Sequence, residues 1–273
     1  MTDSVVYNIP VSMVETYAGR SLIVRSRDPA EIVEGLSMED LARVSYVQVL
    51  SIHPDLERLT LWGQNIPVDL VVQDPERDLP LLYQCSPLLA RHPVRVSVPV
   101  APGFSKVVKL AVSLNFAVKL QVFQPDPFLF EELSRAAHWY LRHATVSQPI
   151  EYFHSLFLAF YRGDPVTLWA IQEEDPSHNR YITDEGKETL SKRFAEGDLK
   201  GEVTSFVTRF RDELIAEERE CSSCEFLGNC SCYFKWPSRE YRCDGVKALF
   251  ETIKDAAEEL RGDLAAFHSM GGK

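Results

Sequence analysis

The sequence has no long apolar run, no excess of positive charge and no cysteine before Cys85. A membrane-spanning helix needs roughly 20 apolar residues in succession, and no stretch comes close to this. The N-terminus, Met-Thr-Asp-Ser, has no basic region followed by an apolar one, as a secretory signal would have. We therefore expect no membrane association and a cytoplasmic protein, in which disulfides are disfavoured.

Acidic residues outnumber basic ones, 40 against 29, which gives a formal net charge of −11 at pH 7. Nucleic acids and anionic membranes attract positively charged surfaces, so the charge argues against sequence-independent binding to either. Part of the acidity lies in Glu173-Glu174-Asp175, which we expect on a solvated surface. The length of 273 residues allows one or two domains with a sizeable core.

Common catalytic and nucleotide-binding motifs are missing as well. The chain contains no G-x-G-x-x-G, no phosphate-binding loop and no G-x-S-x-G. None of its seven histidines pairs with another at the i, i+4 spacing of a metal site. An enzyme that uses other residues is conceivable, but the sequence offers no acid–base set to support one.

Apolar, β-branched runs alternate with helical patterns from about residue 44. The runs cover residues 44–50, 67–72, 94–100 and 117–123. The helical patterns cover residues 79–91, 104–114, 127–143, 150–161, 204–219 and 244–267. This alternation predicts βαβ units, and hence an α/β fold with a parallel sheet. Residues 1–43 are expected to form a lead-in with a short strand at 21–25 and a helix start at 37–40. Residues 168–171 are expected to form another short strand, and residues 179–186 a turn-rich connection.

Cysteine is scarce except at one place near the C-terminus. Five of the six cysteines gather there: Cys221, Cys224, Cys230, Cys232 and Cys243. Clustered thiolates in a cytoplasmic protein usually bind metal, and four of them select zinc or an iron–sulfur cluster. Unliganded core cysteines, structural zinc and iron–sulfur binding are the three interpretations that the spacing leaves open.

The spacing nevertheless suggests which four cysteines act together. Cys221 and Cys224 can bind one centre from a tight turn, Cys230 can close a loop onto it, and Cys243 can complete the set. We expect Cys232 to point elsewhere, because it lies only two positions after Cys230. No second Cys-x₂-Cys pair follows, which disfavours a zinc knuckle.

Two further segments have competing interpretations. The cysteine loop also contains the segment Phe234-Lys235-Trp236-Pro237. This segment is expected to shield the centre from water. The alternative is that it forms a docking face for a partner. Trp169 is expected to be a core residue followed by a solvated acidic loop, in preference to a cleft lined by residues 172–176. The isolated Cys85 is expected to be a small buried core residue.

The cysteine segment resembles the C-terminal end of a SPASM domain. This domain is the cysteine-rich extension of many radical S-adenosylmethionine (SAM) enzymes that modify peptides, and it shows Cys-x₂-Cys-x₅-Cys-x₃-Cys, a gap and a final Cys. Cys221, Cys224 and Cys230 match the first three positions, and Cys243 matches the last after a shortened gap. The cysteine after the x₃ spacer would fall at Phe234 and is missing. The resemblance covers about residues 215–255.

This resemblance implies one auxiliary [4Fe–4S] cluster held by Cys221, Cys224, Cys230 and Cys243. The Cys-x₃-Cys-x₂-Cys motif that binds the catalytic cluster of radical SAM enzymes is absent. The chain is thus expected to be a degenerate relative, with a partial TIM-barrel-like sheet, that does not cleave SAM by itself.

We accordingly expect a lead-in at 1–43, an α/β partial-barrel-like domain at 44–200 and a SPASM-like segment with flanking helices at 201–273. The expected role is electron relay, or recognition of a peptide substrate or partner enzyme, during maturation of a peptide or cofactor. The alternative is a zinc-stabilised protein-interaction module on an α/β domain. Colour distinguishes the two, because an iron–sulfur protein is brown and a zinc protein is colourless.

Overall fold

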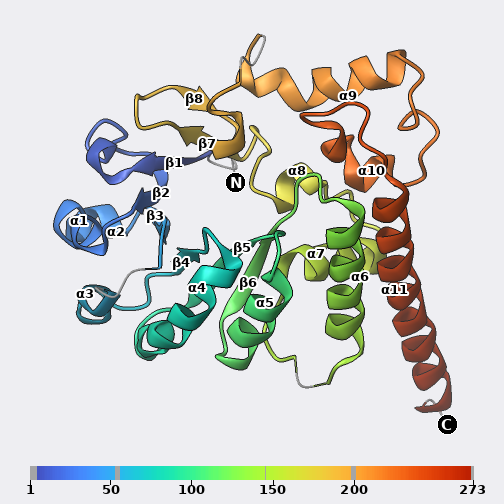
Figure 1. The fold of residues 1–273 in the computed structure, drawn as a ribbon, viewed down its shortest axis with the longest axis horizontal. Coiled ribbons are helices and arrows are strands. Elements are labelled where there is room, and N and C mark those ends of the chain that lie inside the picture. The colour runs from blue at the N-terminus through green and yellow to red at the C-terminus, as the bar shows by residue number, and fades with distance from the viewer. Residues whose placement is uncertain (1–4, 53–55, 145, 198–200, 272–273) are drawn as a thin grey trace.

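An eight-stranded, mostly parallel sheet forms the centre of the molecule (Figure 1). The computed structural model describes residues 5–52, 56–144, 146–197 and 201–271. The strand order is β6-β5-β4-β3-β2-β1-β7-β8, and only β7 and β8 pair antiparallel. The strands are β1 (Val6–Pro10), β2 (Ser21–Ser26), β3 (Val44–Val49), β4 (Val68–Val71), β5 (Val94–Pro99), β6 (Ala117–Gln121), β7 (Asn179–Ile182) and β8 (Glu188–Thr189).

The two faces of this sheet differ in polarity because side chains alternate along each strand. One face is apolar and buried, and includes Leu22, Val24, Val47, Val49, Val68, Leu70, Val94, Val96, Val98, Val118 and Leu120. The other carries polar residues at the intervening positions: Asn8, Arg25, Tyr46, Gln48, Asp69, Arg95, Ser97, Lys119 and Gln121. A buried face with this many polar groups needs internal hydrogen bonds, and it is where a binding site is expected.

Helices cover the apolar face of the sheet (Figure 1). Strands β1 to β6 lie side by side in the order in which they occur in the sequence. Right-handed connections between such strands all lie on the same face of the sheet. The helices of this layer are α1 (Pro29–Gly35), α2 (Met38–Leu41), α3 (Glu57–Leu61), α4 (Pro75–Asp78), a 3-10 helix (Leu79–Ala90), α5 (Phe104–Ser113) and α6 (Pro127–Arg142). At α6, Asp126 caps the backbone N–H of Leu129 and Pro127 occupies the first turn, as the sequence predicts.

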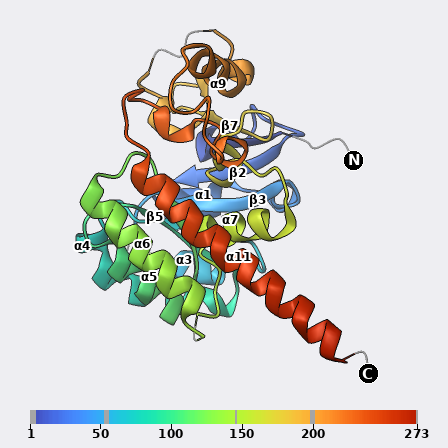
Figure 2. The same ribbon diagram turned by 90° about the vertical axis from the view of Figure 1, so that its right-hand side faces the viewer.

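The rest of the chain packs at the β6 and β7 sides of the sheet. It contains α7 (Glu151–Arg162), α8 (Leu168–Ile171), a 3-10 helix (Lys192–Phe194), α9 (Phe206–Ala216), α10 (Leu227–Cys230), a 3-10 helix (Tyr233–Lys235) and α11 (Asp244–Gly271). The long helix α11 lies across α6 and α7, and its last turns project beyond the body of the molecule (Figure 2). No helix in the described ranges is long and apolar enough to cross a membrane.

Most of the predicted elements are confirmed. The four strands from residue 44 onward, the strand at 21–26, and α5, α6, α7, α9 and α11 all lie where the patterns indicate. The capping box at the start of α2 is present as well, with Ser37 and Asp40 bonding reciprocally. The pattern at 79–91 forms a 3-10 helix, since Pro80 and Pro87 interrupt α-helical hydrogen bonding.

Two predictions about local structure are wrong. Residues 168–171 form the short helix α8, because Thr167 caps the backbone N–H of Ala170. Residues 179–182 form β7, which pairs with β1 on one side and β8 on the other. Besides the expected strand β2, residues 1–43 contribute β1, which lies between β2 and β7 in the sheet.

Candidate functional site

Five cysteines line one small cavity between α9 and α11. Cys221, Cys224, Cys230, Cys232 and Cys243 share its wall with apolar residues that include Phe226, Leu227 and Val246. All are free thiols, and all except the half-buried Cys224 are buried. A buried group of thiols with apolar neighbours fits the donor set of a thiolate-bound metal centre.

A lysine places positive charge beside these sulfurs. The Lys235 side chain is only 5% exposed and forms an ion pair with Glu220 at 2.6 Å. A hydrogen bond from Cys232 lowers the pKa of Cys221 to about 7, with a further contribution from the charge of Lys235, although burial opposes both. Burial, together with a hydrogen bond to Glu220, raises the pKa of Cys243. Metal ligation would require these thiols to lose their protons.

Cys230 has a sulfur that already accepts hydrogen bonds. Burial raises the pKa of its thiol to about 12, but the backbone N–H groups of Phe234 and Tyr233 donate to it and act in the opposite direction. Such N–H···S bonds stabilise a thiolate more than a thiol. Cys230 ends the short helix α10, and the next two residues, Ser231 and Cys232, adopt left-handed backbone conformations that turn the chain sharply.

This turn overturns the expectation that Cys232 would point away from the other cysteines. Simple alternation does not apply to two consecutive left-handed residues, and Cys232 faces the same cavity beside Cys221. Cys85 lies elsewhere, fully buried in the core, and burial raises the pKa of its thiol to about 12. The described residues contain no group of three or more His, Cys, Asp or Glu side chains arranged to hold a metal ion. The ligand set Cys221, Cys224, Cys230 and Cys243 therefore stays a prediction.

The aromatic segment after Cys232 has a different role from either expected one. Phe234 is fully buried and offers no docking face, and neither Phe234 nor Trp236 lines the cysteine cavity. Trp236 packs against Phe194, Phe206 and Phe210 at centroid distances of 5.1, 5.2 and 5.7 Å. The segment thus anchors the cysteine loop to the body of the protein.

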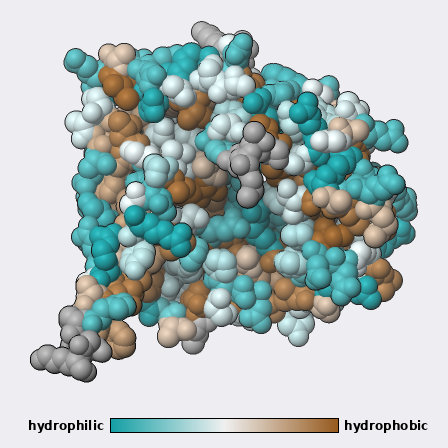
Figure 3. Space-filling view, turned by 180° about the vertical axis from the view of Figure 1, so that it is seen from behind, coloured by the Kyte–Doolittle hydropathy of each residue, from teal (hydrophilic) through white to brown (hydrophobic). Residues whose placement is uncertain are grey.

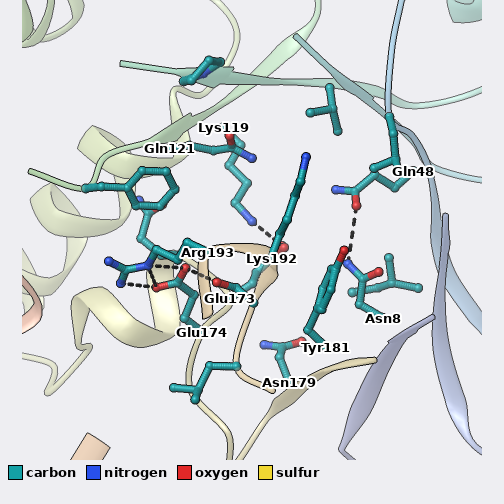
Figure 4. Close-up of a pocket in the computed structure, with 18 of the residues that line it drawn as sticks. Asn8, Gln48, Lys119, Gln121, Glu173, Glu174, Asn179, Tyr181, Lys192 and Arg193 are labelled. Carbon is teal, nitrogen blue, oxygen red and sulfur yellow. Dashed lines mark hydrogen bonds and ion pairs between the residues drawn. The ribbon is translucent and has the colours of Figure 1, made fainter. Parts of the chain in front are cut away.

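A second cavity, of about 440 Å³, opens on the polar face of the sheet. Seen from the side opposite to Figure 1, the surface has a central hollow with a largely hydrophilic floor (Figure 3). The cavity lies toward the carboxyl ends of the parallel strands, where ligands bind in α/β proteins. Its wall includes six carboxamide side chains: Asn8, Gln48, Gln73, Gln121, Gln172 and Asn179. Figure 4 shows several of them around the cavity, together with Tyr181 and Lys192.

Glu173 anchors an ion network beneath this cavity. Its carboxylate accepts hydrogen bonds from Tyr46 at 2.7 Å and from Arg95 at 2.9 Å, and it forms an ion pair with Lys119 (Figure 4). Burial alone raises the pKa of Glu173, but the charges of Lys119 and Arg95 outweigh it and hold the pKa far below its usual range. Arg95 also donates to the buried carboxylate of Asp69 at 3.1 Å.

The neighbouring Glu174 connects the polar cavity with the cysteine loop. It is 3% exposed and pairs with Arg193, whose guanidinium lies 4.6 Å from the centroid of the Tyr233 ring (Figure 4). Trp169 donates a hydrogen bond from Nε1 to the backbone oxygen of Ser231 at 2.9 Å. Arg193, which lines the polar cavity, thus contacts Tyr233 of the cysteine loop, while the two cavities have separate lining residues.

The preferred interpretation of residues 172–176 is consequently wrong. Gln172, Glu173 and Glu174 line the cavity, so local acidity was a poor guide. Gln172 and Glu173 have their partners on distant strands, and Glu174 pairs with Arg193. Sequence reasoning also missed Lys235 and the polar residues of the strands. The alternation of polar and β-branched residues along β3 to β6 is the signal that could have revealed the strand residues.

Comparison with known proteins adds no relative: no family model, curated protein or solved structure matches this chain.

Proposed function

We propose that this protein is a degenerate relative of the radical SAM/SPASM enzymes that holds one [4Fe–4S] cluster and does not itself cleave SAM. The observation that carries the proposal is the gathering of five buried or half-buried thiols around a single cavity, as free cysteines. The ligands would be Cys221, Cys224, Cys230 and Cys243, the set that the resemblance implies. The sequential parallel strands β1 to β6 support a partial TIM-barrel-like scaffold, and α9 to α11 would form the SPASM-like segment.

The residues around the cavity suit a negatively charged thiolate centre. Lys235 supplies a buried cation, the N–H groups of Phe234 and Tyr233 donate to Cys230, and Phe226 and Val246 keep water away. When bound, the cluster would supply one-electron chemistry, with a potential set by these hydrogen bonds and by burial. The protein's own part is to hold the thiolates, offset their charge and exclude solvent.

The polar cavity is the proposed recognition site for a peptide substrate or for a segment of a partner enzyme. Its charges largely neutralise one another, as Glu173 pairs with Lys119 and Glu174 with Arg193. A carboxamide can donate and accept, which matches the paired N–H and C=O groups of a peptide backbone. Part of this capacity is already used within the protein by Asn8, Gln48, Gln73 and Gln172. Because Arg193 in the wall of this cavity contacts Tyr233 of the cysteine loop, a bound segment would lie near that loop for electron relay or recognition.

Iron content tests the proposal directly. The chain is purified without oxygen, reconstituted with iron and sulfide, and assayed for iron and sulfide per chain and for brown colour. We expect one cluster in the wild type, near-complete loss of iron in Cys224→Ser, Cys230→Ser and Cys243→Ser, and full retention in Cys85→Ser, the matched control. Cys232→Ser is expected to retain its iron.

Each alternative gives a distinct result. A colourless protein with one zinc per chain would support the interaction module instead. Equal loss of iron in Cys232→Ser and Cys224→Ser would place Cys232 in the ligand set and overturn the assignment above. Absence of both metals from wild-type protein would leave the cysteines as core residues and end the proposal.

A further inference from the structure

Three polar side chains in the wall of the polar cavity have no partner within the described residues. Gln121 ends β6, Asn179 begins β7, and Lys192 begins the 3-10 helix Lys192–Phe194. All three line the cavity, and in the part of the chain that the structure describes their side chains form no hydrogen bond or ion pair. A ligand can therefore bind these three groups without breaking a contact that the protein already makes.

The charged residues of this wall are mostly paired, and the surplus is positive. The wall has four basic side chains, Lys119, Arg180, Lys192 and Arg193, and three acidic ones, Glu173, Glu174 and Glu196. Lys119 and Arg193 pair with Glu173 and Glu174, and Arg180 pairs with Glu188. Among the described residues, Lys192 and Glu196 have no ion-pair partner. A surplus of positive charge in the cavity of a chain with net charge −11 favours an anionic ligand.

Lys192 is directed into the cavity. Figure 4 shows its side chain extended into the space that the labelled carboxamides surround. Apolar side chains complete the wall, and they include Ile23, Leu50, Val71, Val72, Phe123 and Leu190. A cavity of about 440 Å³ has the size of a small-ligand pocket, so it suits a few residues of a peptide and not a folded domain.

We infer that the polar cavity binds a peptide segment through a carboxylate, which pairs with Lys192, while Gln121 and Asn179 hydrogen-bond to the adjacent peptide backbone. The inference rests on the proposed function, which assigns peptide recognition to this cavity, and it names the chemical group that is recognised. The carboxylate can belong to the C-terminus of the peptide or to an Asp or Glu side chain, since both present two acceptor oxygens to an ammonium group.

Three acetylated tripeptides test this inference. N-acetyl-Ala-Ala-Phe has a terminal carboxylate, N-acetyl-Ala-Glu-Phe-amide has a side-chain carboxylate, and N-acetyl-Ala-Ala-Phe-amide has none. Titration calorimetry measures their binding to reconstituted wild-type protein at low and high salt. We expect at least one of the two acids to bind about fivefold more tightly than the uncharged amide, with a preference that falls as salt rises. The acid that binds more tightly identifies the source of the carboxylate. Equal affinity for all three probes, or binding of none at millimolar concentration, would overturn the inference.

Lys192→Gln and Glu196→Gln form a matched pair of variants. Each removes one charge from an exposed residue of the same cavity wall, and the two charges have opposite signs. Lys192→Gln should bind the preferred acid no more tightly than the uncharged amide. Glu196→Gln should bind that acid at least as tightly as wild type does. A preference for the acid that persists in Lys192→Gln, or that both variants lose, would contradict the role assigned to Lys192.

Iron content of the same samples separates this inference from the proposed cluster. Lys192 does not line the cysteine cavity, so Lys192→Gln should hold as much iron as wild type. Wild-type protein that binds iron but shows no preference for either acid would refute the inference and leave the cluster assignment standing. Wild-type protein that prefers an acid but holds no iron would support the inference and refute the cluster assignment.

Discussion

At the scale of single residues, the polar face of the sheet depends on a few buried or half-buried carboxylates that accept from several donors each. Glu173 adopts a left-handed backbone conformation, with φ 58°, which costs a non-glycine residue about 1 kcal/mol or more. Three side chains from three different strands, Tyr46, Arg95 and Lys119, nevertheless bind its carboxylate. The contacts hold the strained residue in place and fix the floor of the cavity.

The ion pairs of Glu173 make its contribution to stability depend on pH. Because its pKa is lower in the folded state than in the unfolded one, its stabilising effect is complete above the unfolded value of about 4.3 and is lost as the pH falls below it. Glu173→Gln should cost about 2 kcal/mol at pH 7, since it leaves the buried Lys119 without its carboxylate and removes one of the carboxylates that Arg95 contacts. The difference in urea-unfolding free energy from wild type should shrink steadily between about pH 4.5 and pH 2.5.

Glu131→Gln is a suitable control for this pH series, since Glu131 is 73% exposed on α6. Its unfolding free energy should stay close to that of wild type throughout. Glu151, whose pKa is raised mainly by burial, changes stability in the opposite direction. The charge of Glu173 also raises the pKa of Glu151, so Glu173→Gln should lower it and Glu151 contributes to the measured difference. A gap between wild type and Glu173→Gln that stays constant from pH 7 to pH 2.5 would contradict the role assigned to these ion pairs.

At the scale of elements, the start of α11 fits closely against α6. A Cβ atom placed on Gly245 would lie 2.9 Å from Cγ of Phe130, which real Cβ atoms do not tolerate. The Phe130 ring in turn lies 6.2 Å from that of Phe234 in the cysteine loop. A close approach of α11 to α6 therefore helps to position the loop that carries the proposed ligands.

Two glycines of the same helix give a matched pair of variants. Gly245→Ala should destabilise the protein by about 1–3 kcal/mol, because overpacking forces α11 away from Phe130. A Cβ atom placed on Gly262 would meet no other atom within 4 Å, so Gly262→Ala should leave the unfolding free energy unchanged or raise it by up to about 1 kcal/mol. Urea unfolding followed by circular dichroism measures both, and equal effects would show that the contact with Phe130 is unimportant.

The elements also show how far sequence reasoning reaches. Strands β3 to β6 and the longer helices could be predicted, because each is long enough to display its own period and its own cap. The strands β1 and β7 could not, since Val6–Pro10 and Asn179–Ile182 are short and pair with each other across more than 160 residues of sequence. The cysteine cluster was evident from its spacing, whereas Lys119 and Glu173 became recognisable as partners only once the fold had brought them together.

At the scale of the whole molecule, the cysteine cavity and the polar cavity have separate linings, which are joined by contacts between the cysteine loop and the end of the sheet. Gln124 donates from Nε2 to the backbone oxygens of Phe234 and Ser238, at 2.8 and 2.9 Å, and so joins the end of β6 to the cysteine loop. Arg193 and Trp169 make similar connections from the other side. A change of charge at the thiolates would therefore reach the wall of the polar cavity through these contacts.

The final prediction concerns the chemistry of the complete protein with SAM. Reductive cleavage of SAM needs a cluster with one iron free of protein ligands, and a cluster held by Cys221, Cys224, Cys230 and Cys243 has none. A radical SAM enzyme would carry its three cysteines after the first strand of the barrel. Here the segment between β1 and β2 begins with a 3-10 helix over Val11–Met13 and contains no cysteine. Reconstituted protein incubated with SAM and dithionite should form no 5′-deoxyadenosine above a cluster-free control. Turnover would mean that one of the four thiolates is not a permanent ligand, or that iron binds elsewhere, and it would refute the proposal that the protein lacks this activity.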